Sequence, residues 1–357
     1  MKWFKRSGKL AAAVGMSLCL SLGFGTVLPG AAADAYAEER LLGISEYGPV
    51  QDIGERQNAA SETAAESVPE TTAAAAQNSA AFSAASGNLS KLTADSATQA
   101  IGDAVNSRYA AVYDLDQNRL VAAKNASQVI YPASMTKIMT VLVCAERVSN
   151  LEEKLTVTQD IVDYIHAHDA SNCGFTAGEQ VRVKDLLYGI VLPSGADAVM
   201  VLTRHIAGSD EAFVKLMNQK AQELGLSANT HFTNATGLYH AEHRTTLGDM
   251  AEILNAAMKN PLAREVLSAH KYTTAATNKH ASGLSFSNLF LRRIEDQKLG
   301  GAAVRMAKTG YVRQSMFCAA SYGTSASGKH YIVVTAYGSG TWQCIYDQAA
   351  LYRSFTA

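Results

Sequence analysis

An α/β fold with an antiparallel sheet, a helical cluster and flanking helices is the architecture that this sequence predicts. Two observations predict it. Segments rich in aromatic and β-branched residues gather at both ends of the folded region, over residues 108–123 and 302–337. The segments between them are long and mostly apolar, as expected for buried helices. Strands from both ends can pair in one sheet, which the central helices then cover.

The elements follow in order along the chain. Residues 108–114 and 119–123 read as two strands joined by a turn at 116–118. Residues 134–147 follow a break at Pro132 and contain neither glycine nor proline, which favours a buried helix. Further helices are predicted at 183–191, 196–206, 210–224 and 247–258, then strands at 302–308, 315–322 and 330–337, and a closing helix at 342–355.

The charge balance excludes some classes of protein. The 357 residues carry 31 basic and 32 acidic side chains, a formal net charge of −1. A nucleic-acid-binding protein normally has a marked basic excess, so no nucleic-acid partner is expected. The hydrophobic fraction of 48% is ample for a core. The length leaves room for one large domain or two ordinary ones.

The N-terminus has the pattern of an export signal. Four basic residues precede an uncharged stretch at 10–28, and small residues follow, with A-x-A steps ending at Ala33 and Ala37. We predict a signal peptide over residues 1–37, cut after Ala37 or Ala33. The alternative is an uncleaved membrane anchor, because the uncharged stretch of 19 residues approaches the length of a membrane span. Cleavage is favoured, so an extracytoplasmic protein of the cell envelope or a secreted protein is expected.

The next segment has too little apolar surface to fold alone. Residues 59–86 contain 12 Ala, five Ser and three Thr among 28 residues. We predict a flexible linker over residues 38–96 and one folded domain over residues 97–357, with no anchor after its closing helix and a monomeric state. The four cysteines of the mature chain allow three disulfide pairings or buried free thiols. The pairs His166/His168 and His240/His243 have zinc-like spacing, but no third ligand is evident.

Three short motifs carry chemistry. Ser134 and Lys137 lie three residues apart, which places them on one face of a helix and within side-chain reach. A lysine can remove the proton of a serine if burial and a nearby cation lower its pKa. Ser194 lies in the break between two helices and could relay a proton. Lys308, Thr309 and Gly310 end a strand. There the lysine and threonine could bind a carboxylate, the glycine lets a substrate backbone come close, and the N–H of Tyr311 could complete an oxyanion hole.

Order and spacing make the set more specific than any one motif. An S-x-x-K, a serine loop about 60 residues later and a K-T-G about 115 residues further are typical of penicillin-binding proteins and class A β-lactamases. Together with residues 112–116, 132–140, 185–189, 232–238 and the strand at Ala320-Ser321, the chain resembles the low-molecular-mass penicillin-binding D-alanyl-D-alanine carboxypeptidases. The resemblance extends from about residue 107 to 355 and implies a β-lactamase/transpeptidase-like domain.

The resemblance also implies roles. Ser134 would be acylated by the penultimate D-alanine of a peptidoglycan stem peptide, with Lys137 as general base and Ser194 passing the proton to the departing amine. Lys308 and Thr309 would hold the terminal carboxylate, and Gly310 would let the substrate backbone come close. The backbone N–H groups of Ser134 and Tyr311 would form the oxyanion hole. β-Lactams would be covalent inhibitors, and neither a metal nor an organic cofactor would be needed.

Two departures from the family pattern leave alternatives open. The second motif usually ends in asparagine, but Ala196 stands there, and the following Asp197 is expected to point elsewhere. A catalytically weakened module that binds peptidoglycan or β-lactams is therefore the second hypothesis. The segment after K-T-G also lacks the expected glycine, and the role of Arg313 stays open. A β-lactamase is a third hypothesis, but Glu211 and Glu223 lie in helical contexts without the pattern of a deacylating base.

Overall fold

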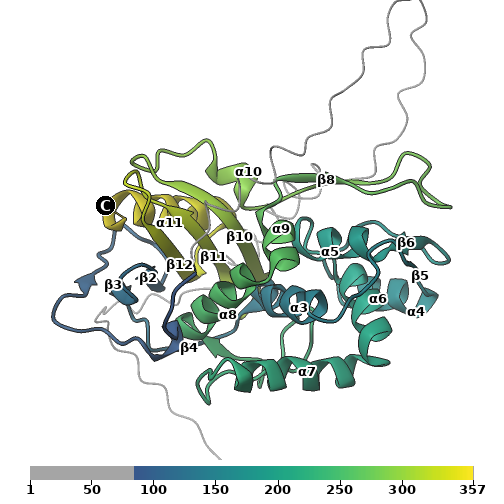
Figure 1. The fold of residues 1–357 in the computed structure, drawn as a ribbon, viewed down its shortest axis with the longest axis horizontal. Coiled ribbons are helices and arrows are strands. Elements are labelled where there is room, and N and C mark those ends of the chain that lie inside the picture. The colour runs from purple at the N-terminus through teal and green to yellow at the C-terminus, as the bar shows by residue number, and fades with distance from the viewer. Residues whose placement is uncertain (1–83, 357) are drawn as a thin grey trace, which may run out of the picture. The chain divides into compact units, whose positions relative to one another are not determined.

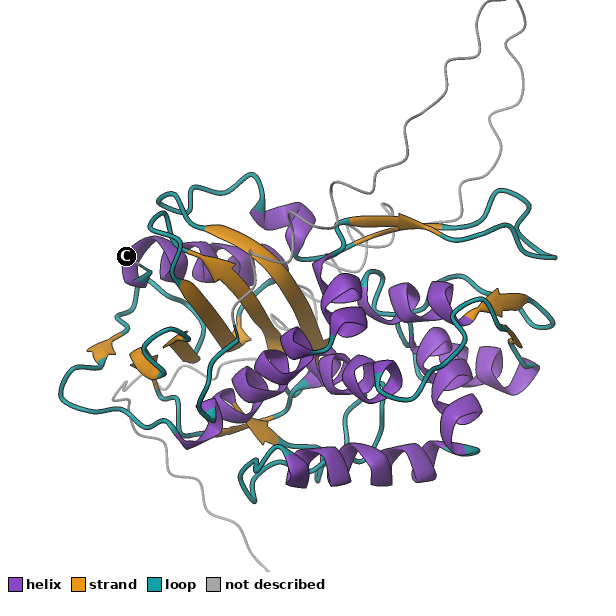
Figure 2. Ribbon diagram, in the orientation of Figure 1, coloured by secondary structure: helices purple, strands orange, loops and turns teal. Residues whose placement is uncertain are grey.

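A six-stranded sheet forms the centre of the computed structural model, which describes residues 84–356 (Figures 1 and 2). The strand order is β1-β3-β2-β12-β11-β10, and every neighbouring pair is antiparallel except β1 with β3. The predicted antiparallel sheet is thus confirmed, with one short parallel edge. The bounds are β1 Gln99–Ala100, β2 Tyr109–Asp114, β3 Arg119–Lys124, β10 Ala303–Val312, β11 Met316–Thr324 and β12 His330–Gly338.

Side chains of the sheet alternate between two buried faces. Val112 on β2 is paired with Val333 on β12, and both belong to the core cluster under the C-terminal helix. Their neighbours Tyr113 and Ile332 point into the larger cluster on the opposite face. Because both faces are covered, the central strands read as nearly continuous apolar runs. This pairing of strands from the two ends of the domain is the one expected from the sequence.

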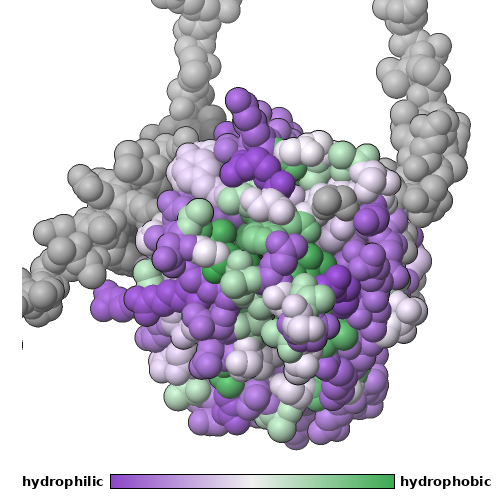
Figure 3. Space-filling model, turned by 90° about the vertical axis from the view of Figure 1, so that its left-hand side faces the viewer, coloured by the Kyte–Doolittle hydropathy of each residue, from purple (hydrophilic) through white to green (hydrophobic). Residues whose placement is uncertain are grey.

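Helices cover the two faces of the sheet. Helix α11, Thr341–Phe355, covers one face, and α8, Leu247–Lys259, crosses the other between the sheet and the helical cluster (Figure 1). Figure 3 views the side on which β3 and the end of α11 lie, where apolar side chains gather near the centre and hydrophilic ones surround them. The other helices are α3 Thr136–Ala145, α4 Gln159–Ala167, α5 Val183–Val191, α6 Ala196–Ala207, α7 Asp210–Glu223, α9 Pro261–Ser268 and α10 Leu291–Ile294.

Several elements were not predicted. Helix α4 buries only Ile161 and Ile165, so its apolar signal is weak. Helix α9 has eight residues, yet Asn260 caps it and Pro261 stands in its first turn, which is a recognisable start signal. Three short antiparallel pairs were also missed because they have only two or three residues a strand: β4 Val129–Ile130 with β7 Thr245–Thr246, β5 Lys154–Thr156 with β6 Gln180–Arg182, and β8 Lys271–Thr273 with β9 Ser285–Ser287.

The packed part of the chain begins before residue 97. Ala85 and Leu89 are buried in the core. The backbone N–H of Ala85 donates to Asn255 Oδ1 at 2.8 Å, and that of Leu89 donates to Glu252 Oε2 at 2.8 Å. Residues 84–96, assigned to the linker from their composition, are therefore attached to α8, because buried polar groups on that helix receive their backbone. The predicted signal peptide and the linker as far as residue 83 lie outside the described residues.

Two further sequence questions have structural answers. Cys144, Cys173, Cys318 and Cys344 are all buried free thiols. Burial raises the pKa of each of these thiols, so they are uncharged at neutral pH. Among the helices of residues 84–356, none is both long and apolar enough to cross a membrane.

Candidate active site

Ser134 and Lys137 face each other at the start of α3. Ser134 lies in a 3₁₀ turn, Ala133–Met135, and α3 begins at Thr136 rather than at Ser134 as predicted. The tighter turn does not separate the pair. Lys137 Nζ donates to Ser134 Oγ at 3.0 Å and to the carbonyl oxygen of Thr236 at 2.6 Å. The predicted serine–lysine contact is therefore present in the structure.

The surroundings of Lys137 favour its uncharged form. The residue is 2% exposed. Burial lowers the pKa of Lys137 to about 7, although the neighbouring Cys173 and Asp197 side chains act in the opposite direction. An amine with this pKa is partly neutral at physiological pH and can accept the proton of a hydroxyl group.

Ser194 pairs with the second buried lysine. Lys308 Nζ donates to Ser194 Oγ at 3.0 Å and to the carbonyl oxygen of the next residue in the strand, Thr309, at 3.0 Å. Ser194 lies between α5 and α6 with a φ of 65°, a left-handed backbone that turns its side chain toward β10. Burial, and secondly the charge of Lys137, lower the pKa of Lys308 well below its usual range. The structure thus brings all three motifs to one place.

The K-T-G strand lies against the backbone of the serine turn. A Cβ atom on Gly310 would lie 2.9 Å from the backbone nitrogen of Ser134 and 3.0 Å from that of Met135. Glycine is therefore required for this approach. Thr309 is partly exposed, Tyr311 is 37% exposed with its ring 4.4 Å from that of Phe317, and Arg313 is exposed.

The loop at 232–238 supports Lys137 and was singled out in the sequence only through resemblance. Asn234 Oδ1 accepts hydrogen bonds from Gly237 N at 2.7 Å and from Thr236 Oγ1 at 3.1 Å, which fixes the loop. The carbonyl oxygen of Thr236 then receives Lys137, and that of Ala235 receives Thr140 Oγ1 at 2.8 Å. No local pattern reveals these backbone acceptors, because they meet α3 only in the folded chain.

Replacing Gly237 with alanine is expected to destabilise the domain by about 2 kcal/mol or more. Gly237 has a φ of +78°, and an added Cβ would lie 2.1 Å from the carbonyl oxygen of Ala133. Urea unfolding of the two proteins measures the change. Gly102→Ala is the matched control, since nothing lies within 4 Å of an added Cβ there. Equal losses of unfolding free energy in the two variants would contradict the expectation.

The buried side chain of His243 is hydrogen-bonded to Thr136, the first residue of α3. Its Nδ1 accepts the backbone N–H of Thr233 at 3.1 Å, so the ring proton is on Nε2, which donates to Thr136 Oγ1 at 2.8 Å. Burial lowers the pKa of His243 to about 3. The predicted H-x-x-H pair is therefore divided: His243 is a buried structural side chain and His240 is exposed. Within residues 84–356, no group of three or more His, Cys, Asp or Glu side chains could hold a metal.

His243 is expected to make the protein sensitive to acid. Its pKa is about 3 when folded against a usual 6.5, so the unfolded chain gains a proton first as the pH falls. The stability that depends on the neutral ring is complete above pH 6.5 and is lost below it. Between pH 7 and pH 5 wild type should lose about 2 kcal/mol more than His243→Gln. Urea unfolding at both pH values measures this; equal losses would show that His243 is not responsible.

The structure also places the second motif and the two glutamates that were considered as a deacylating base. Ala196 is 2% exposed, and its backbone N–H donates to the carbonyl oxygen of Ser171 at 2.7 Å. Asp197 accepts hydrogen bonds from the backbone N–H of Cys173. Glu211 and Glu223 lie on α7, and Glu223 forms an ion pair with Lys220 at 2.7 Å. These two glutamates contribute nothing to the site.

Fold and site together define a class. A central antiparallel sheet bounded by helices, with a serine–lysine pair at a helix start and a second lysine on the edge strand, is the β-lactamase/transpeptidase-like fold. Residues 93–336 match the D-alanyl-D-alanine carboxypeptidase family of peptidases, Peptidase S11. The chain belongs to this family, that of the low-molecular-mass penicillin-binding proteins.

Individual relatives agree with the family match. The chain is 28% identical to the D-alanyl-D-alanine carboxypeptidase DacF of Bacillus subtilis, over 65% of this chain and 57% of that protein. It is 36% identical to the D-alanyl-D-alanine carboxypeptidase of Streptomyces sp. strain K15, over 42% and 53%. The crystal structure of the Streptomyces K15 DD-transpeptidase superposes with a TM-score of 0.63 at 26% identity, over 70% of this chain and 97% of that one. The chain spans about half the length of these curated relatives.

Proposed function

We propose that this protein is an exported serine D-alanyl-D-alanine carboxypeptidase that removes the terminal D-alanine from peptidoglycan stem peptides. The observation that carries the proposal is the 3.0 Å contact between Ser134 Oγ and the buried Lys137 Nζ, whose pKa of about 7 allows it to act as a base. The names of the relatives support the substrate class.

The reaction begins with the attack of Ser134 Oγ on the carbonyl carbon of the penultimate D-alanine, while neutral Lys137 accepts the hydroxyl proton. The backbone N–H groups of Ser134 and Tyr311 stabilise the negative oxygen that forms. The proton then passes through Ser194 to the departing nitrogen, the C–N bond breaks, and D-alanine leaves. Water hydrolyses the ester on Ser134 and restores the hydroxyl group.

Substrate recognition rests on the K-T-G strand. Lys308 and Thr309 hold the terminal carboxylate, and Gly310 lets the peptide backbone come close. A β-lactam presents a similar carboxylate and carbonyl group, so β-lactams are covalent inhibitors in this proposal. We propose an extracytoplasmic location, in the cell envelope or secreted, because the N-terminal 37 residues have the pattern of a signal peptide. We further propose that the protein acts as a monomer without a cofactor.

Release of D-alanine from a pentapeptide ending in D-Ala-D-Ala tests the activity. Many molecules of D-alanine per protein molecule are expected, measured with a coupled D-amino-acid oxidase. The second candidate is a weakened module that binds peptidoglycan or β-lactams. It rests on Ala196, which lacks the side-chain amide of the family's asparagine. A protein that binds the pentapeptide or becomes labelled by penicillin, but releases no more than one D-alanine per molecule, would favour that candidate.

A further inference from the structure

Asp197 is a buried carboxylate directly behind the serine loop. It is 2% exposed and lies in the first turn of α6, next to Ala196. Its two oxygens accept the backbone N–H of Cys173 at 3.0 and 2.9 Å, and Oδ1 also accepts the N–H of Ala198 at 2.9 Å. The thiol of Cys173 donates to the same carboxylate. Asp197 thus ties a separate loop, residues 171–178, to the start of α6.

Two glycines allow that loop to lie close to the turn that carries Ser194. An added Cβ on Gly195 would lie 2.2 Å from Cys173 Sγ and 2.6 Å from Asp197 Oδ1, and one on Gly189 would lie 2.7 Å from Cys173 Sγ. The backbone N–H of Gly195 donates to the carbonyl oxygen of Gly189 at 2.9 Å. The Cys173 side chain therefore fills the space beneath the turn that carries Ser194, and Asp197 holds it there.

The charge of Asp197 acts on Lys137. The titratable groups around Lys137 are Lys308 on β10, Asp197 on α6 and Cys173 on the loop. The charge of Lys137 lowers the pKa of Lys308, whereas the Asp197 carboxylate favours the charged form of Lys137. Burial raises the pKa of the Cys173 thiol well above its usual value, so the thiol is neutral. Asp197 is then the one negative group among these three neighbours.

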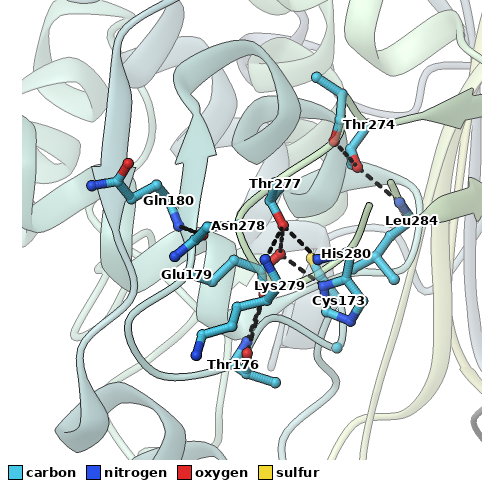
Figure 4. Close-up of polar contacts among 12 residues, drawn as sticks. Cys173, Thr176, Glu179, Gln180, Thr274, Thr277, Asn278, Lys279, His280 and Leu284 are labelled. Atoms are coloured by element: carbon cyan, nitrogen blue, oxygen red, sulfur yellow. Dashed lines mark hydrogen bonds and ion pairs between the residues drawn. The ribbon is translucent and has the colours of Figure 1, made fainter. Parts of the chain in front are cut away.

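A second buried carboxylate anchors the other end of the loop (Figure 4). Glu179 is fully buried and accepts hydrogen bonds from the backbone N–H of Thr176 at 2.9 Å and from Thr277 Oγ1 at 2.7 Å. It also pairs with His280 Nδ1 at 2.8 Å. Thr277 and His280 belong to the connection between β8 and β9, which Figure 4 shows lying over the loop. Glu179 is not among the charges that act on Lys137.

We propose that Asp197 is a positioning residue for acylation: it holds the Cys173 loop beneath the turn that carries Ser194 and supplies a negative charge near Lys137, in place of the side-chain amide that Ala196 lacks. This inference rests on the proposed function. Asp197 touches no reacting atom, and it acts through Ser194 and through the field at Lys137. Glu179 fixes the outer end of the same loop but not the charge at the lysines.

The test compares Asp197→Asn with Glu179→Gln, two isosteric losses of a buried charge at the two ends of one loop. The readout is the second-order rate of acylation by a fluorescent penicillin between pH 5 and pH 9. In Asp197→Asn the high-pH plateau should fall about tenfold, because Ser194 is displaced. The midpoint should move to lower pH by about half a unit or more, because the pKa of Lys137 loses a raising charge. Glu179→Gln should keep the wild-type midpoint.

The outcomes separate this inference from the proposed function. A wild-type protein that takes up no penicillin overturns both. Wild-type acylation together with an unchanged plateau and midpoint in Asp197→Asn overturns only the role of Asp197. An equal shift of the acylation midpoint in Glu179→Gln also overturns the role of Asp197, because the loss of any buried charge on this loop would then move the midpoint.

A second variant covers the case in which Asp197→Asn does not fold, as judged by its thermal unfolding. Ala196→Asn restores the family residue while Asp197 stays in place. Because Asp197 already holds the loop and supplies the charge near Lys137, the acylation rate of Ala196→Asn should be within about threefold of wild type or lower. A rate at least ten times that of wild type would show that the site lacks the amide, which overturns the inference.

Discussion

Replacing Ser134 with alanine is expected to abolish covalent labelling by a fluorescent penicillin and to lower D-alanine release by at least about a thousandfold. The mechanism proposed above has one nucleophile. We do not expect Ser194 to replace it, because Ser194 is 3% exposed and its hydroxyl group is hydrogen-bonded to Lys308. Denaturing gel electrophoresis after incubation with the penicillin measures labelling, and mass spectrometry of the labelled peptide locates the ester.

We expect Ser134→Ala to lose activity without losing stability. The Ser134 side chain makes its hydrogen bond with Lys137, which keeps the Thr236 carbonyl oxygen as a partner when the hydroxyl group is gone. The unfolding free energy should therefore stay within about 1 kcal/mol of wild type. Ser149→Ala, at an exposed serine beyond the end of α3, is the matched control and should label fully. Labelling of Ser134→Ala at wild-type intensity would refute the assignment of the nucleophile.

The acylation rate is expected to rise with pH through a midpoint of about 7. Only neutral Lys137 can accept the serine proton. Below the midpoint the lysine is protonated, so the rate should fall about tenfold for each pH unit; above it the rate should reach a plateau. Stopped-flow labelling between pH 5 and pH 9 measures the profile. A rate that does not vary across this range would exclude Lys137 as the base.

The variant Lys137→Arg distinguishes two roles of this side chain, accepting a proton and carrying a positive charge. A guanidinium group does not lose its proton in proteins, so this variant should acylate at least about a thousandfold more slowly and show no midpoint near pH 7. Lys154→Arg makes the same change at an exposed lysine of β5 and should leave the profile unchanged. A Lys137→Arg protein with more than a tenth of the wild-type rate would contradict the proposed role.

Local patterns were sufficient for most of the fold. Strands β2, β3, β10, β11 and β12 were anticipated within a few residues. The signal is clearest in β2, β11 and β12, which are buried along most of their length. Helix α5 was anticipated at its observed bounds, since a proline–serine–glycine break follows it. Helices α4 and α9 and the three short strand pairs were not, because they bury few side chains and their pairing partners lie far away in the chain.

The boundary near residue 84 illustrates the limit of composition. Ala85 and Leu89 lie in a segment of small and polar residues that carries almost no apolar signal. Their packing depends on Glu252 and Asn255, which lie 163 and 170 residues away and accept their backbone N–H groups. A segment with few apolar residues can thus be ordered when a neighbouring helix satisfies its polar backbone.

The sequence by itself determined the contact between Ser134 and Lys137, because they are three residues apart and one turn of chain brings them together. Only the tertiary structure decided what surrounds that pair. Ser194 meets Lys308 across 114 residues, and Thr236 meets Lys137 across 99. The pKa of Lys137 is set by burial and by charges on other elements, and neither quantity is a property of local sequence.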